Sequence, residues 1–116
     1  MKKYLVLYHA PMTPEMMEQM MSRPKEEIAK GMEAWMQWAQ KCGSNLVEMG
    51  SPLMGGQVLT GDGNSTNSDK NVAGYSILQA NSMDEAKALL TGHPHLGSWN
   101  PAATIEVHEF MPMPGM

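Results

Sequence analysis

Residues 72–85 read VAGYSILQANSMDE, a predicted strand that leads directly into the start of a helix. The strand is expected to cover Val72 to Ala80. Ser82 and Glu85 then have the spacing of a capping box, in which the serine hydroxyl and the glutamate carboxylate satisfy free backbone amides at a helix start. The helix that begins here is predicted to end at Gly92, because glycine commonly terminates helices. Its inward-facing residues are expected to be Met83, Ala86, Leu89 and Leu90.

One further strand is predicted at each end of the chain. Ala102 to Phe110 forms the last strand, after an irregular stretch from His93 to Pro101. Lys3 to His9 forms the first strand, and both of its faces are largely apolar, which is typical of a central strand covered on two sides. One face carries Tyr4, Val6 and Tyr8, and the other carries Leu5, Leu7 and His9.

Two helical segments are predicted after the first strand. Thr13 is a suitable N-cap with Pro14 at the first helical position. This helix should stop near Ser22, because Pro24 disfavours helical backbone in the residue before it. The second helix is predicted from Pro24 to Cys42. Its apolar stripe consists of Ile28, Met32, Trp35, Ala39 and Cys42, and its wet side includes Lys30, Gln37 and Lys41.

The middle of the chain predicts two short strand pieces and a loop. The pieces are Asn45 to Met49 and Gln57 to Thr60, separated by a turn at Gly50-Ser51-Pro52. Gly55-Gly56 indicates a bulge or a tight bend. Residues 61–71 are only Gly, Asp, Asn, Ser, Thr and Lys, so we expect a solvated, mobile loop there.

The resulting order of elements is strand, helix, strand, strand, helix, strand. With right-handed crossovers this order gives an α+β fold, a ferredoxin-like βαββαβ sandwich with an antiparallel sheet and helices on one face. Residues 1–116 are expected to form a single domain. The segment 111–116 is a Pro/Met tail that cannot pair as a central strand, because its two prolines lack the amide donor. Apolar side chains on both faces of the first strand predict a homodimer that stacks sheet on sheet.

Composition excludes several classes of protein. Leu, Ile, Val and Phe number 18 of 116 residues, but the net charge is only −4 and 14 methionines add apolar volume, so we expect a folded domain. Eight Lys and Arg against 12 Asp and Glu, without a basic cluster, argue against nucleic acid and anionic membranes as partners. No stretch approaches the ~20 apolar residues of a membrane span. Cys42 is the only cysteine, which excludes an internal disulfide and favours the cytoplasm.

Three of the four histidines are expected to meet at one end of the sheet. The topology places His9, His93 and His95 there, together with Asp62 and Asp69 of the predicted loop. Imidazole titrates near neutral pH, so these histidines are candidate catalytic acids or bases. Helix-end capping and loop packing are the competing explanations. No short metal-ligand motif is present, and the sequence predicts neither a metal nor a cofactor.

Four stretches of the sequence resemble the YCII-related family, close to its DGPF-domain branch. They are Gly74 to Ala80, Ser82 to Ala86, Gly92 to Leu96, and Ile105 to Val107. The resemblance implies a dimeric α/β-barrel arrangement of two ferredoxin-like sheets. Most members have no known reaction, and a few relatives act on chlorinated aromatic or lactone-type compounds.

The resemblance also implies an acid–base pair that this chain does not keep. The family's histidine position falls at Met32 or, in another register, at Glu26, and its Asp-Pro position falls at His93-Pro94. Imidazole would then replace the carboxylate at an active site. Ser68-Asp69-Lys70-Asn71 stands where the DGPF tetrapeptide would be.

Two functional hypotheses remain open at this point. The first is a protein that binds a small organic molecule in a pocket near His93 and His95, with acid–base catalysis as an extension. The second is a non-catalytic interaction or accessory protein on the same dimeric scaffold. A pocket beside the imidazoles would favour the first hypothesis.

Overall fold

The computed structural model describes residues 1–97 and 99–114. The last two residues of the predicted tail lie outside these ranges. Within them the strands are β1 (Lys2–His9), β2 (Leu46–Pro52), β3 (Gln57–Leu59), β4 (Ser65–Asn67), β5 (Val72–Ala80) and β6 (Thr104–Glu109). The helices are α1 (Pro14–Met21), α2 (Lys25–Cys42) and α3 (Met83–Leu89), with 3₁₀ turns η1 (Gly43–Asn45) and η2 (Pro94–Leu96).

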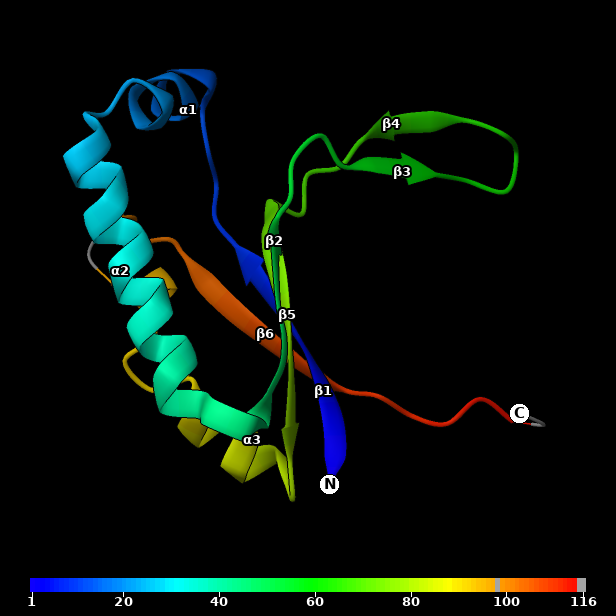
Figure 1. Ribbon diagram of the computed structural model, residues 1–116. Helices are drawn as coiled ribbons and strands as arrows, with labels where there is room; N and C mark the ends of the chain where they lie inside the picture. The colour runs from blue at the N-terminus through cyan, green and yellow to red at the C-terminus, as the bar shows by residue number, and fades with distance from the viewer. Residues whose placement is uncertain (98, 115–116) are drawn as a thin grey trace.

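The main sheet has four antiparallel strands in the order β2-β5-β1-β6. Helices α2 and α3 lie on one of its faces, and no helix of the described residues lies on the opposite face (Figure 1). This is the strand order of a ferredoxin-like α+β fold, so the predicted fold class is confirmed. None of the helices in the described ranges is long and apolar enough to cross a membrane.

The alternation of β1 determines where the core lies. Tyr4, Val6 and Tyr8 are buried beneath the helices, whereas Leu5 and Leu7 on the uncovered face are half-buried. Side chains alternate between the two faces of a strand, so one strand serves both surfaces. The helices and the neighbouring strands contribute Trp38, Cys42, Leu78, Ala80, Ala86 and Leu90 to the core.

The predicted helix caps are present. The Met16 amide donates to Thr13 Oγ1 at 3.1 Å, and the Glu85 amide donates to Ser82 Oγ at 3.2 Å. The Glu85 carboxylate accepts from the amide of Asn81 at 3.3 Å, one residue before the expected partner. Local capping chemistry therefore located the starts of both α1 and α3.

The prediction for the middle of the chain is wrong in two places. Residues 50–52 are not a turn, because β2 continues through them to Pro52. Gly50 has φ +82° and forms an irregularity opposite Tyr75, which absorbs the bend inside the strand. The predicted loop contains β4, which pairs with β3 in a separate hairpin. Polar composition alone did not reveal this hairpin, because its strands are held by mutual hydrogen bonds and not by burial.

The predicted apolar stripe of α2 is correct only in the C-terminal half of the helix. Ile28 and Met32 are 45% and 54% exposed, whereas Trp35 and Ala39 are half-buried and Cys42 is buried. Figure 1 shows the first turns of α2, together with α1, extending beyond the end of β1, where no sheet lies beneath them. No residue of α1 is buried, so its two methionine pairs, Met16-Met17 and Met20-Met21, do not cover the core of this chain.

Candidate functional site

His93 lies at the centre of the layer between α2 and the sheet. It follows α3 and precedes Pro94, and its side chain is 1% exposed. The imidazole is surrounded by aromatic rings, with centroids at 4.3 Å for Trp38, 4.5 Å for Trp35 and 5.0 Å for Tyr8. A polar ring in such a place is stable only if its nitrogens are hydrogen-bonded.

Both ring nitrogens of His93 take part in one chain of hydrogen bonds. Ser76 donates its only hydroxyl proton to the carbonyl of Met49 at 2.6 Å, so it accepts from Tyr8 Oη at 2.7 Å. Tyr8 therefore accepts from His93 Nε2 at 3.1 Å, while His93 Nδ1 accepts from the amide of His95 at 2.9 Å. At each of these contacts only one of the two atoms can be the donor. The series of hydrogen bonds therefore fixes His93 as the neutral tautomer with its proton on Nε2.

Burial keeps the hydrogen-bonded side chains of His93 and Tyr8 uncharged at neutral pH. It lowers the pKa of His93 from 6.5 to about 4, with a smaller contribution from the nearby His95 ring. Burial also raises the pKa of Tyr8 to about 12, against the opposing effect of the Ser76 hydrogen bond. The neutral imidazole can therefore act here as a fixed hydrogen-bond bridge between η2 and the sheet.

His95 joins the ends of two strands. Its Nε2 donates to the carbonyls of His9 and Thr104, at 3.0 and 3.1 Å. The backbone carbonyl of His95 accepts from the indole of Trp99 at 2.9 Å. The ring is 5% exposed, so these contacts close the end of the core.

His9 lies on the opposite face of the sheet. Its Nδ1 lies 2.8 Å from the carbonyl of Lys70, and its Nε2 lies 2.8 Å from Glu106 Oε1. Both partners are acceptors, so each ring nitrogen forms its hydrogen bond only when it carries a proton. Hydrogen bonds from His9 and then from His108, whose Nε2 lies 3.0 Å from the second oxygen, lower the pKa of Glu106.

The predicted histidine cluster is therefore divided by the sheet. His93 and His95 lie on the helix side, and the ring of His9 lies on the uncovered side. The alternation of the first strand contained this signal, because it groups His9 with Leu5 and Leu7. Among the described residues, the hydrogen bonds of the Asp62 side chain all lie within its own hairpin turn.

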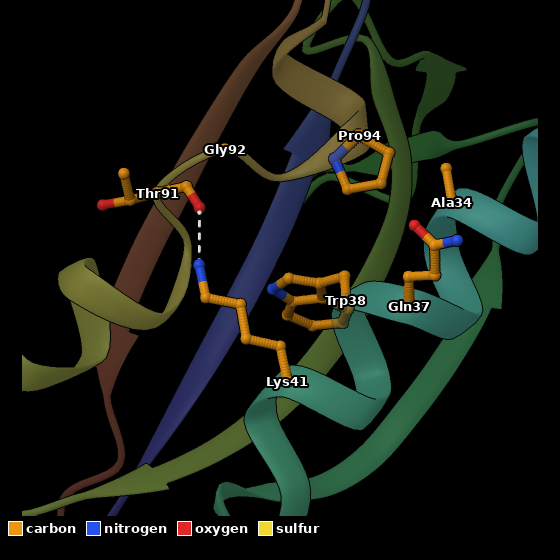
Figure 2. A pocket seen from close by; sticks show the side chains of 7 residues that line it. All are labelled: Ala34, Gln37, Trp38, Lys41, Thr91, Gly92 and Pro94. Carbon is orange, nitrogen blue, oxygen red and sulfur yellow. Dashed lines mark hydrogen bonds between the residues drawn. The ribbon is translucent and has the colours of Figure 1, made fainter.

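An open cleft of about 290 Å³ lies beside His93, between α2 and the segment after α3. Figure 2 shows the Trp38 indole and the Lys41 side chain on its α2 side, opposite Pro94. The remaining lining residues are Ala34, Gln37, Thr91 and Gly92. The Trp38 indole packs against the His93 ring, with 4.3 Å between the ring centroids, and it donates to the carbonyl of Leu89 at 2.9 Å.

Sequence reasoning placed Gln37 and Lys41 on the wet side of their helix and did not identify the cleft. The two residues are four apart and so share a helical face. Lys41 Nζ donates to the carbonyl of Thr91 at 3.4 Å, a long bond for an exposed ammonium. Within residues 1–97 and 99–114, no three His, Cys, Asp or Glu side chains are grouped to hold a metal ion.

The fold and the site define a class of protein: a small ferredoxin-like α+β domain with one uncovered sheet face and a cleft between α2 and the segment after α3. The family model for the YCII-related domain matches residues 4–112, so the chain belongs to the YCII-related family. A search of the curated proteins finds no match to the chain.

Removal of the Tyr8 hydroxyl tests the hydrogen-bond chain. Tyr8→Phe leaves His93 Nε2 without its acceptor, and we expect the free energy of unfolding to fall by about 1–3 kcal/mol. Tyr4→Phe is the matched control, because Tyr4 lies on the same strand face and its hydroxyl donates to Glu109 at 3.3 Å, outside the hydrogen bonds of His93. Urea denaturation should show a clearly smaller loss for the control. Equal losses of unfolding free energy in the two variants would contradict the hydrogen bonding assigned to Tyr8 and His93.

Proposed function

We propose that this YCII-related protein binds a small organic molecule in the cleft between α2 and the segment after α3. The observation that carries the proposal is that the fixed indole of Trp38 and the polar side chains of Gln37 and Lys41 line the same cleft. The Trp38 indole is held by a hydrogen bond and by the His93 ring, so its position is set before any ligand arrives. Ligand sites commonly combine such apolar walls with a few placed polar groups.

The lining residues indicate the chemistry of the ligand. Trp38 and Pro94 provide apolar surfaces for a planar body, and Lys41 and Gln37 provide donors for an oxygen acceptor. The volume of about 290 Å³ is at the lower end of the usual range for ligand pockets. A planar molecule with one carboxylate or similar group fits these constraints.

The contacts of His93 favour ligand binding in the cleft without acid–base catalysis by this residue. Both nitrogens of its ring are bonded within the protein, and the residues that line the cleft include its neighbours Gly92 and Pro94 but not His93 itself. The Nε2 of His95 bridges two carbonyls. The catalytic assignment of His93, His95 and His9 stays a prediction, and the contacts of the first two support a role in positioning the cleft.

Benzoate is a suitable probe for this proposal. We expect millimolar benzoate to shift the indole N–H resonance of Trp38, with Trp99 as the internal reference. Lys41→Gln should weaken binding roughly threefold to fivefold, in keeping with the loss of one exposed charge interaction. Lys30→Gln, an exposed position on the same helix, is the matched control. An unchanged Trp38 resonance, or equal weakening by both substitutions, would contradict the proposal.

A second candidate function rests on the uncovered face of the sheet. Leu5, Leu7, Tyr75 and Ile77 form a half-buried apolar centre there, flanked by Glu48 and by Glu106 with its partners His9 and His108. An apolar centre with a polar rim is typical of protein interfaces. It supports a homodimer and a non-catalytic interaction role. Sedimentation at micromolar concentration tests this candidate, and a 12.8 kDa monomer would contradict it.

Two finer assignments belong to the same proposal. We place the chain near the DGPF-domain branch of the family, although Ser68 to Asn71 replaces the tetrapeptide itself. We also propose a reducing compartment, the cytoplasm, because the single thiol of Cys42 is buried and has no disulfide partner in the chain.

A further inference from the structure

The outer edge of β6 is unpaired in the described part of the chain, because β6 is the last strand of the sheet. The amide of Phe110 donates to the carbonyl of Lys3 at 2.9 Å, on the β1 side. Backbone groups alternate sides along a strand, so those of Ile105, Val107 and Glu109 face the free edge. An edge of this kind can accept one more strand.

An apolar groove lies directly under this edge. It has a volume of about 380 Å³ and runs between α3 and β6. Leu90 and Leu96 line its helical side, and Ile105 and Val107 line its sheet side. The last two residues are the ones whose backbone faces the free edge. A strand added here would place every second side chain in the groove.

The C-terminal segment of the chain has the pattern that this edge requires. Met111 and Met113 are 76% and 66% exposed, and they alternate with Pro112 and Pro114. In an extended backbone the two methionine amides point to one side, and the prolines, which have no amide, occupy the other. The segment can therefore pair along one side only, which suits the addition of a single edge strand and stops further growth.

We propose that residues 110–113 of one copy pair with the free edge of β6 in a second copy, where Met111 and Met113 fill the groove. Opposite residues of a hydrogen-bonded antiparallel pair project to the same face, so methionines paired with Val107 and Ile105 point into the groove. Thioether side chains adapt to irregular apolar spaces of this kind. This inference is independent of the proposed cleft ligand.

The occupant is a second copy because the segment cannot return to its own strand. Phe110 is still bonded to β1, and Figure 1 shows the segment leading away from α3. A two-residue turn at Met111-Pro112 would leave Met113 as the only methionine able to pair. Exchange between copies lets both methionines pair.

Two full-chain variants test the exchange. The tail variant, Met111→Ser with Met113→Ser, keeps the groove and loses the apolar segment. The groove variant, Leu96→Glu, keeps the segment and places a charge at a groove position that is 48% exposed. Isotope-labelled tail variant is mixed with excess unlabelled groove variant. We expect the amide resonances of Ile105 and Val107 to shift, because the missing segment is supplied by another molecule.

The control mixture replaces the unlabelled partner with a chain that carries all three substitutions, and it should give no shift at these amides. A synthetic peptide of residues 110–114 provides a second measurement that does not depend on the groove variant. Changing its two methionines to serine should weaken binding roughly tenfold or more. The absence of shifts with both partner chain and peptide, or equal shifts with the control mixture, would overturn the proposal.

Discussion

Replacing His93 with alanine is expected to lower the free energy of unfolding by about 3–5 kcal/mol. The substitution removes a ring packed against Trp35, Trp38 and Tyr8, and it leaves a cavity between α2 and the sheet. It also deprives the Tyr8 hydroxyl and the His95 amide of their partners. Unsatisfied buried polar groups add to the cost of the cavity.

Urea denaturation of His93→Ala and His108→Ala gives the comparison. His108 is the matched control, because it is an exposed histidine whose ion pair with Glu106 lies at the surface. Exposed pairs of this kind contribute about 0–1 kcal/mol. A loss for His93→Ala as small as that of the control would contradict the supporting role of the buried ring.

Gly50→Ala is expected to destabilise the fold by about 4 kcal/mol, at the upper end of single substitutions. An added Cβ would lie 1.7 Å from the carbonyl oxygen of Tyr75, a backbone atom that cannot move without distorting β5. The residue also has φ +82°, a backbone conformation that costs alanine about 1–2 kcal/mol by itself. Both effects act on β2, the strand whose Met49 carbonyl accepts the hydrogen bond from the Ser76 hydroxyl.

Gly63→Ala separates the two effects. Gly63 has a similar φ of +88°, but no atom of the described residues lies within 4 Å of its added Cβ. Thermal or urea unfolding should therefore show only the conformational cost at Gly63, about 1–2 kcal/mol. If the two alanine variants are equally stable, the close approach of β2 to β5 is not as described.

The fold could be predicted where local chemistry determines the structure. Thr13 and Ser82 mark helix starts through their own hydroxyls, and Pro24 separates two helices through its own ring. The irregularity at Gly50 and the β3–β4 hairpin could not be predicted in the same way. Gly50 is required by a carbonyl of β5, which lies 25 residues further along the chain. Its role becomes visible only when the sheet is assembled.

The candidate site was predicted only in part, because its remaining features also depend on contacts between segments that are distant in the sequence. Topology placed the three histidines at one end of the sheet, and the segment of His93 to His95 does lie against that end of β1, although the ring of His9 is on the other face. The burial of His93 did not follow, because it depends on Trp38, which the helical stripe left out. The cleft exists only where the segment after α3 packs beside α2, so Gln37 and Lys41 looked like ordinary solvated residues.

The lowered pKa of His93 also predicts how stability depends on pH. The unfolded chain binds a proton near pH 6.5, whereas the folded chain resists protonation until about pH 4. The contribution of the neutral ring to stability is therefore complete above pH 6.5 and is lost as the pH falls toward 4. A shift of this size corresponds to roughly 3 kcal/mol.

Whether His93 supports a binding cleft or transfers protons is decided by its protonation state in the folded protein. Ring nitrogen NMR of the native chain between pH 5.5 and 8 measures this state directly. We predict a neutral ring with its proton on Nε2, bonded to Tyr8, and no titration across this range. A His93 ring that titrates near pH 6.5, or carries its proton on Nδ1, would contradict the supporting role and would restore His93 as a candidate acid or base.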